Sequence, residues 1–311
     1  MRFTRMHIVV IGAGGVGGYF GSRLARAGRS VTFVARGAHL DQIRRDGLRV
    51  RSAIEGESTV RVDAVEKLDA TRPADVVLLC VKAFDTEAAI EKIRPVVGPE
   101  TAVVSLQNGV DNEDKIDALL GPGHAVGGAA YVFAVLEAPG VIAHTLGGKI
   151  VFGELDGRVT ARGERLRDAL VAAGVPVELS TNVRRTLWEK YLLISAQAGM
   201  TALTRCPLGI VRDTPESWRM YRMIVEELGA VARAAGVALP ADSVASITGA
   251  AAGMAPHLYS SLYHDLIQGK RLELEALHGH AVRLGERLGV PTPMVFAVYA
   301  ALRPHVDGRR G

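Results

Sequence analysis

An apolar segment that runs directly into a glycine-rich turn constrains the fold of this chain more than any other feature. Residues 6–11 read Met-His-Ile-Val-Val-Ile, and residues 12–17 follow at once as Gly-Ala-Gly-Gly-Val-Gly. A continuous apolar run of this kind is typical of a parallel strand that is buried on both faces. A G-x-G-x-x-G turn after such a strand, opening a helix, is the fingerprint of a dinucleotide-binding βαβ unit. The sequence therefore predicts a parallel sheet with a dinucleotide beside its first strand.

Each glycine of this turn has its own physical role in the fingerprint. Gly12 permits a sharp turn, Gly14 lets backbone N–H groups approach a pyrophosphate, and Gly17 lets the next helix pack close to the strand. A helix over residues 15–27, stopped by Gly28, directs its positive end toward the phosphates. An ordinary tight turn is the alternative interpretation. The predicted cofactor-binding turn consists of Gly12, Ala13, Gly14, Gly15, Val16 and Gly17.

The end of the second predicted strand indicates which dinucleotide is bound. After the apolar residues 30–35, Arg36 occupies the place where an acidic residue would accept hydrogen bonds from the ribose hydroxyls of NAD. A guanidinium pairs with a 2′-phosphate through charge-assisted hydrogen bonds, whereas a carboxylate would repel it. We therefore expect NADPH as the cofactor. The alternative is that Arg36 is an ordinary solvated residue at a strand end.

The pattern of apolar segments divides the chain into two domains. Up to about residue 183, short apolar strands such as 75–81 and 101–106 alternate with amphipathic helices, as in a doubly wound sheet. Ser180-Thr181-Asn182 then supplies helix-capping residues, and long helical patterns follow. The fold class expected is an α/β Rossmann-type N-terminal domain, residues 1–183, plus an all-α C-terminal domain, residues 184–311.

Two polar residues follow the predicted central strands. Lys82 comes after the strand at residues 75–81, and Asn108 comes after the strand at residues 101–106. In open α/β sheets, ligands lie outside the carboxyl ends of the strands. Both residues are therefore expected to lie beside cofactor or substrate. A lysine whose stem covers apolar surface and an Asn-Gly turn are the alternative interpretations.

A lysine in the second half of the chain has an unusual helical setting. Lys190 shares a predicted helix face with Ile194, Gln197 and Thr201. Burial on such a face would lower the pKa of the lysine toward neutrality, which suits a general acid for a carbonyl oxygen that gains negative charge. The alternative is a structural lysine whose head reaches solvent. Ser261 and Glu273 follow in the last helical region.

Several motifs occur together in the order found in one family, and the chain resembles the ketopantoate reductases, or 2-dehydropantoate 2-reductases. The resemblance extends over nearly the whole chain. The motifs that carry it are Gly-Ala-Gly-Gly-Val-Gly-Gly with Arg36, Val-Lys82-x-x-Asp85, Leu106-Gln-Asn-Gly109, Trp188-x-Lys190, Ser260-Ser261, and Arg271-Leu-Glu-Leu-Glu-x-Leu-x-Gly279.

The resemblance implies an activity and roles for individual residues. In the family, NADPH delivers hydride to the 2-oxo group of ketopantoate in a cleft between the domains, and the pantoate formed serves pantothenate and coenzyme A synthesis. By matching motif, Lys190 is the general acid, Glu273 holds a substrate hydroxyl or Lys190, and Ser261 contacts the substrate carboxylate. Asn108 and Lys82 border the nicotinamide and help to position Lys190, and Asn108 also contacts the substrate.

One departure from the family pattern concerns the substrate. Four and eight positions after the lysine, where the family usually has Asn, this chain has Ile194 and Ala198. Gln197 lies at nearly the same angle as Lys190 around the helix and could supply a substitute amide. A reductase of a more apolar 2-oxo acid is therefore an alternative. A second alternative, a non-catalytic NADPH-binding regulator, has no need for Lys190 and Glu273 beside the nicotinamide.

Composition excludes several other classes of protein. The formal charge of +4 is spread over short basic pairs, without the basic helix or interleaved aromatics that would indicate nucleic-acid binding. No apolar run approaches the roughly 20 residues that span a bilayer, so a cytoplasmic protein is expected. The two cysteines form no CxxC pair, and Glu275-x-x-His278 lacks a second metal-binding motif, so no metal is predicted. A homodimer is possible through the small-residue helix at residues 245–253.

Overall fold

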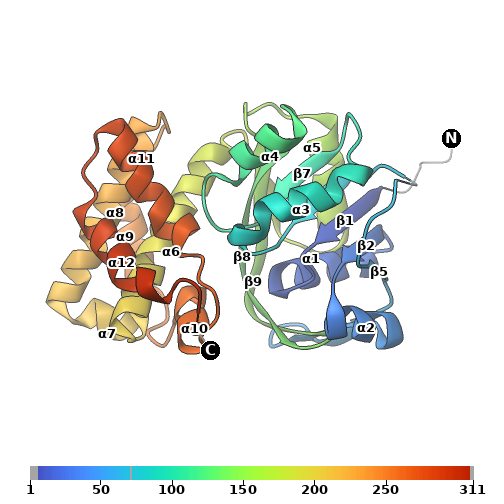
Figure 1. Cartoon of the computed structure of the whole chain (residues 1–311), viewed down its shortest axis with the longest axis horizontal. Coiled ribbons are helices and arrows are strands. Elements are labelled where there is room, and N and C mark those ends of the chain that lie inside the picture. The colour runs from blue at the N-terminus through green and yellow to red at the C-terminus, as the bar shows by residue number, and fades with distance from the viewer. Residues whose placement is uncertain (1–5, 71, 309–311) are drawn as a thin grey trace. The chain divides into compact units, whose positions relative to one another are not determined.

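The computed structural model describes residues 6–70 and 72–308, which form two compact units (Figure 1). The first unit contains the described residues up to Gln107 and then Asn112–Val183. The second contains Arg184 onward together with the short segment Asn108–Asp111. The chain therefore visits the second unit for four residues and returns to the first before it finally crosses at residue 184.

The first unit is built on a single mixed sheet. Within the described residues, its strands are ordered β4-β3-β9-β8-β7-β6-β1-β2-β5, with β10 paired to β9. All pairings from β8 through β7, β6, β1 and β2 to β5 are parallel, as expected for a doubly wound unit. The strands are β1 His7–Ile11, β2 Ser30–Val34, β3 Leu48–Ser52, β4 Gly56–Val60, β5 Asp63–Val65, β6 Val76–Leu79, β7 Ala102–Ser105, β8 Ala125–Ala138, β9 Val141–Glu154 and β10 Val177–Leu179.

Alternate residues of the central strands pack on opposite faces of this sheet. On β1, Ile8 and Val10 join a core with α1 Gly15–Arg26, α2 Gly37–Asp46 and α5 Ala161–Ala172. The residues between them, Val9 and Ile11, join a core with α3 Thr86–Ile93 and α4 Asn112–Leu120. Period-two alternation with helices over both faces explains why the sequence of β1 is apolar throughout.

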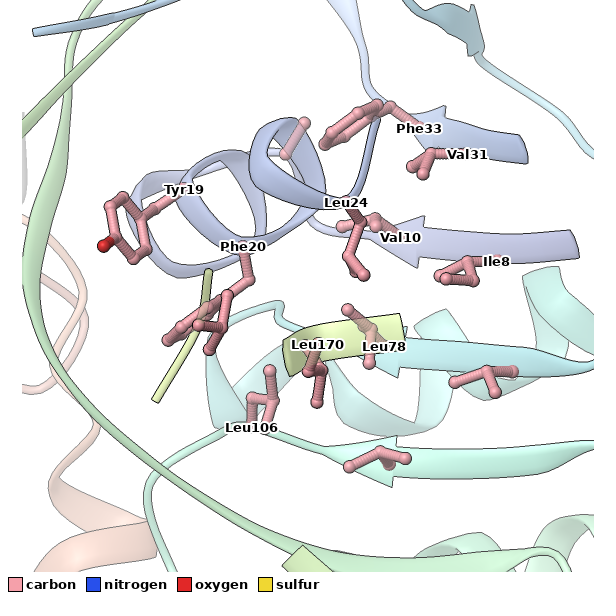
Figure 2. Close-up of a cluster of buried hydrophobic side chains, with 14 of the residues drawn as sticks. Ile8, Val10, Tyr19, Phe20, Leu24, Val31, Phe33, Leu78, Leu106 and Leu170 are labelled. Atoms are coloured by element: carbon pink, nitrogen blue, oxygen red, sulfur yellow. The ribbon is translucent and has the colours of Figure 1, made fainter. Parts of the chain in front are cut away.

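The packing of α1 against the sheet is visible in Figure 2. Phe20 and Leu24 of α1 pack with Val10, Leu78 and Leu106 of the first core, and Leu170 of α5 belongs to the same cluster. All six side chains are essentially buried. This core fixes α1 against β1, and so fixes the turn between them.

The two longest strands, β8 and β9, form an antiparallel hairpin that curves along one side of the unit (Figure 1). The register shifts at three places, which are the irregularities that bend a sheet. The turn between these strands contains Gly140, which is buried and has a φ of +75°. A positive φ of this size is readily adopted only by glycine.

The second unit is helical in its described part and has its own apolar core. Its central helix, α6, is buried on several sides, and small residues such as Ala196, Ala198 and Ala202 let neighbouring helices approach closely. Among the described helices, none has an apolar stretch long enough to cross a membrane. The helices are α6 Val183–Thr204, α7 Leu208–Asp213, α8 Pro215–Ala234, α9 Ser243–Ala252, α10 Ser261–Ile267, α11 His280–Leu288 and α12 Pro293–Leu302.

The fold class predicted from the sequence, an α/β Rossmann-type unit and an all-α unit, is confirmed. The boundaries differ in detail. The strand predicted at 75–81 is β6, Val76–Leu79, and residues 80–82 continue as a loop. The last predicted helical region is interrupted after Glu273, since Glu275–Gly279 forms a turn of π-helix before α11 begins at His280.

Candidate functional site

The glycine-rich loop between β1 and α1 has the shape that a phosphate requires. Gly12 has a φ of +96°, and a Cβ there would lie 2.7 Å from the backbone carbon of Cys80. A Cβ on Gly17 would collide with the carbonyl oxygen of Gly12. At Gly14, by contrast, an added Cβ would meet no atom within 4 Å. The loop is therefore closed toward the sheet and open at Gly14.

The first turn of α1 offers backbone donors at this opening. Gly14 is the N-cap residue, and no side chain caps the helix. The first N–H groups of a helix have no partner within the helix, and they carry its positive dipole end. The first turn also contains no acidic side chain that would compete with an anion. An open, donor-rich loop of this kind fits the pyrophosphate of a dinucleotide.

Arg36 lies where the second strand ends. It is the N-cap residue of α2, two residues beyond β2, and its side chain is exposed. Within residues 6–70 and 72–308, no hydrogen bond or ion pair engages its guanidinium group, so the group is available to a ligand. Its position at the carboxyl end of β2 is the one that a contact to the adenosine ribose requires.

Gln107 anchors the carboxyl ends of the central strands. Its side-chain amide donates to the carbonyl oxygen of Val81 at 3.0 Å and to the hydroxyl of Thr86 at 2.8 Å. These bonds tie the end of β7 to the loop after β6, where half-buried Lys82 precedes the short 3₁₀ turn Ala83–Asp85. Lys82 therefore lies at the carboxyl edge of the sheet, as predicted.

Asn108, predicted to follow the next strand, belongs to the helical unit. The segment Asn108–Asp111 packs there through Val110, which contacts the helical core. The carboxylate of Asp111 lies 3.5 Å from Nδ1 of His280. The chain turns at Gly109, whose φ is +105°. Asn108 is thus grouped with Lys190 and Glu273, although it is close in sequence to the sheet.

The predicted catalytic residues are buried in the helical unit. Lys190 on α6 is 9% exposed, and Glu273, just before the π-helical turn, is 6% exposed. Lysine and glutamate are almost never buried without a functional or structural partner, because burial of a charge carries a large desolvation cost. A buried residue of each charge within one apolar unit is therefore a candidate site.

Side-chain bonds join α6 to the segments that carry the other predicted residues. Thr201 of α6 donates to the hydroxyl of Ser260 at 2.8 Å, and Ser260 caps α10 by accepting from the N–H of Tyr263. Ser261 is the next residue and is exposed, at the start of α10. The face of α6 that bears Thr201 therefore meets the N-terminus of α10.

A second set of bonds fixes the π-helical turn against α6. The hydroxyl of Tyr191 donates to the carbonyl oxygen of Leu277 at 2.8 Å, and Nε2 of His278 lies 3.0 Å from the carbonyl oxygen of Ser195. Turns of π-helix occur frequently at functional sites. Glu273 lies two residues before this turn, so the same bonds hold its segment close to α6.

Gln197 is a polar residue of α6 that lies largely inside the helical unit. It is 6% exposed, and in the part of the chain that the structure describes no group hydrogen-bonds its side-chain amide. Ile194 and Ala198 stand at the two positions where the family usually has Asn. Ile194 is partly buried and Ala198 is buried, and neither offers a polar side-chain atom. The amide of Gln197 is therefore the polar side-chain group that these three positions can offer to a ligand.

Glu275 and His278, which have the spacing of a metal-ligand pair, each contact other protein groups. Oxygens of the Glu275 carboxylate accept from the hydroxyl of Tyr299 and from Arg283, both at 2.8 Å. The His278 ring is completely buried against α6, and burial lowers its pKa to about 4. The two side chains therefore have separate structural partners.

Sequence reasoning missed three contacts that shape the site. They are made by His39 with the glycine-rich loop, by Gln107 with Val81, and by Thr201 with Ser260. Their partners are 26, 26 and 59 positions away in sequence. For Gln107 a signal was present, because it directly precedes Asn108 at a strand end. No local pattern distinguishes His39, and the helical spacing that places Thr201 on the face of Lys190 does not predict its contact with Ser260.

Together, the fold and these residues define the class of protein. A doubly wound unit with an open glycine-rich loop, followed by a helical unit with buried ionisable residues, is the arrangement of a dinucleotide-binding oxidoreductase.

Comparison with known proteins identifies the family. The sequence matches "Ketopantoate reductase PanE/ApbA" over residues 8–157 and "Ketopantoate reductase PanE/ApbA C terminal" over residues 182–306. The chain belongs to the ketopantoate reductase family and is an oxidoreductase of that family.

Relatives match over nearly the full length. The chain is 31% identical to an uncharacterized oxidoreductase, YkpB, of Bacillus subtilis, over 96% of this chain and 98% of that protein. It is also 31% identical to a 2-dehydropantoate 2-reductase of Mesorhizobium japonicum, over 96% and 97% of the two chains. The crystal structure of a PanE/ApbA family ketopantoate reductase from Ralstonia eutropha is similar at a TM-score of 0.88, with 38% identity over 96% and 98% of the chains.

Proposed function

We propose that this protein reduces 2-dehydropantoate to pantoate with NADPH. The observation that supports it most is the burial of Lys190 in the helical unit of a ketopantoate reductase family member, on the helix that contacts the start of α10. Glu273 and Asn108 belong to the same unit. This set supplies an acid, a carboxylate and an amide, which are the groups needed to hold and protonate a 2-oxo acid.

The cofactor residues are proposed from the open loop and the strand end. Gly12–Gly17 binds the pyrophosphate with backbone N–H groups, and Arg36 pairs with the 2′-phosphate. Lys82 and Asn108 border the nicotinamide. When bound, the cofactor supplies a hydride to the carbonyl carbon of the substrate.

Lys190 completes the reduction by donating a proton to the carbonyl oxygen, which becomes the hydroxyl of pantoate. In its protonated form the lysine also stabilises negative charge as that charge develops on the oxygen. Glu273 accepts a hydrogen bond from the substrate hydroxyl or from Lys190, and a carboxylate beside a lysine favours the charged lysine. Ser261, Asn108 and Gln197 hold the remaining polar groups of the substrate.

The test is the rate of NADPH oxidation by the purified protein with ketopantoate and with trimethylpyruvate. Trimethylpyruvate carries a methyl group where ketopantoate has its hydroxymethyl group, so the two substrates differ by one hydroxyl. A site that binds this hydroxyl should favour ketopantoate by at least about tenfold in kcat/KM. Absence of NADPH oxidation with every 2-oxo acid, together with retained NADPH binding, would instead favour a non-catalytic regulator.

A second candidate is reduction of a more apolar 2-oxo acid, and Ile194 and Ala198 are the observation that favours it. An apolar wall cannot pair with a substrate hydroxyl, so such a site gains nothing from ketopantoate over trimethylpyruvate. Equal or reversed preference between the two substrates supports this candidate. Replacing Gln197 with Ala separates the cases further, because the variant loses the ketopantoate preference only if the amide binds the hydroxyl.

A further inference from the structure

His39 joins three parts of the first unit that are far apart in sequence. It lies on α2, three residues after Arg36, and its ring is half-buried. Nε2 lies 2.7 Å from the carbonyl oxygen of Ala13 in the glycine-rich loop. Nδ1 accepts a hydrogen bond, at 2.8 Å, from the backbone N–H of Gly140 in the turn between β8 and β9.

These two partners determine the protonation state of the ring. The Gly140 N–H can only donate, so Nδ1 must offer its lone pair, whereas the Ala13 carbonyl can only accept, so Nε2 must carry hydrogen. Only the neutral ring with hydrogen on Nε2 satisfies both. A protonated ring would set its Nδ1–H against the N–H of Gly140 and leave that buried donor without an acceptor. Burial of the ring lowers its pKa, which also favours the neutral form. The bond to Ala13 raises the pKa by a smaller amount.

The bond to Ala13 acts directly on the cofactor loop. The Ala13 carbonyl and the Gly14 N–H belong to one planar trans peptide, so they point in opposite directions. When His39 fixes the carbonyl on one side, it fixes the direction of the Gly14 N–H on the other. Gly14 is the loop residue with open space beside it. His39 therefore orients a phosphate donor without touching the phosphate.

We propose that His39 is a positioning residue for the dinucleotide, and that its neutral ring holds the glycine-rich loop and α2, with Arg36, in the arrangement that binds cofactor. This inference rests on the proposed NADPH dependence and adds to it a residue and a pH response. Since the neutral ring is required, cofactor affinity falls as acid protonates the ring.

Other charged or titratable groups lie on or beside the three joined segments, and one of them is His144 on β9, whose Nδ1 lies 2.8 Å from the hydroxyl of Ser52. On α2 the nearest charged residues in sequence are Arg36 and Asp41. The loop at residues 12–17 contains no titratable side chain. Beside the β8–β9 turn, Glu137 is ion-paired with Arg51 at 3.0 Å.

The test measures the dissociation constant of NADPH from pH 5 to pH 8 for the wild-type protein and for His39→Gln. Glutamine keeps a donor for the Ala13 carbonyl and does not titrate. At pH 8 the variant should bind NADPH about 2- to 12-fold more weakly, the effect of one lost hydrogen bond. Below pH 6 the wild-type affinity should fall more steeply than that of the variant. Titration of the cofactor's own phosphate is common to both proteins and cancels in the comparison.

A matched control is His124→Gln. Nδ1 of His124 lies 3.0 Å from the carbonyl oxygen of Thr101, elsewhere in the same unit, so this variant should keep the wild-type affinity and pH profile. If wild type and His39→Gln share one pH profile, the inference is overturned and the proposed function stands. If the wild-type protein does not bind NADPH at any pH, both fail.

A second measurement does not depend on how the variant folds. Because coupling between two binding events is reciprocal, a cofactor that prefers the neutral ring must lower the pKa of His39 when it binds. Histidine titration of the labelled wild-type protein by NMR, with and without NADP⁺, should show this decrease for His39. An unchanged His39 titration in the presence of bound NADP⁺ overturns the inference.

Discussion

Lys190 is a buried lysine of the helical unit, and its burial makes a general-acid role testable. In the proposed mechanism, replacing it with Ala removes the proton donor and the positive charge that act in the transition state. We expect kcat to fall by about 100- to 10,000-fold, the usual contribution of general acid catalysis, while the dissociation constant of NADPH changes less than about twofold. Steady-state kinetics and fluorescence titration check this.

The control for Lys190 is Lys270→Ala, since Lys270 is an exposed lysine in the same unit. It should keep the wild-type kcat. A purely structural role for Lys190 predicts a different pattern, in which kcat, cofactor affinity and melting temperature all decline together.

Arg36 provides the second prediction at the residue scale. Its exposed guanidinium at the start of α2 is proposed to pair with the 2′-phosphate, which NADPH has and NADH lacks. Arg36→Ala should weaken NADPH binding by about 10- to 100-fold, the effect of losing a hydrogen bond to a charged group, and should leave NADH binding nearly unchanged. Calorimetric titration with both cofactors measures the two affinities.

Arg45→Ala is the matched control for Arg36, because Arg45 is exposed near the other end of the same helix. It should change neither affinity. Equal weakening of NADPH and NADH in Arg36→Ala would contradict the assignment to the 2′-phosphate.

At the scale of the element, the β1–loop–α1 segment contains two glycines whose roles can be distinguished by experiment. A Cβ on Gly17 would collide with the Gly12 carbonyl, whereas a Cβ on Gly14 meets open space. Gly17→Ala should therefore destabilise the first unit by about 1–3 kcal/mol, the usual cost of overpacking. Gly14→Ala should lower the melting temperature less than Gly17→Ala, because the added Cβ meets no atom within 4 Å and the cost is limited to a poorer N-cap residue.

For cofactor affinity we expect Gly14→Ala to have a large effect. A methyl group at Gly14 occupies the space proposed for the pyrophosphate, so NADPH binding should weaken at least about tenfold although the fold is intact. Thermal melting and NADPH titration of both variants check this. Wild-type NADPH affinity in Gly14→Ala would show that the open side of the loop is not the phosphate site.

The same element shows why much of the fold could be predicted. An apolar strand, a glycine turn and a helix are local signals, and both faces of β1 are buried because helices cover both sides of the sheet. The π-helical turn at Glu275–Gly279 carries no such signal. It is held by bonds from Tyr191 and to Ser195, more than 80 residues away, so only the packed unit defines it.

The candidate site divides in the same way. Strand-end residues such as Lys82 follow from position alone, since the carboxyl edge of a parallel sheet is where ligands bind. The place of Asn108 in the helical unit cannot be predicted from its position after a strand. The segment Asn108–Asp111 leaves the first unit because Val110 packs in the helical core and Asp111 approaches His280, which are contacts across about 170 positions. Amphipathic periodicity in the sequence does not show that these four residues leave one unit and pack in the other.

At the scale of the whole molecule, buried His278 should determine part of the acid lability. Complete burial lowers its pKa from 6.5 to about 4, so the folded protein keeps the ring neutral in a range where the unfolded chain protonates it. A folded pKa below the unfolded one means that this contribution to stability is complete above about pH 6.5 and declines as pH falls toward 4. The free energy of unfolding should fall by roughly 3 kcal/mol over this range because of His278.

The variant His278→Gln removes this titration and keeps a side-chain donor that can reach the Ser195 carbonyl. Urea unfolding between pH 4 and pH 7.5 should therefore show a flatter pH dependence for the variant, whatever its stability at neutral pH. The buried carboxylate of Glu154 has a lowered pKa, so its contribution is lost at more acidic pH and is common to both proteins. His257→Gln, at an exposed position of the same unit, should retain the wild-type slope. Parallel slopes for wild type and His278→Gln would mean that the buried ring gains its proton through local opening, without unfolding of the helical unit.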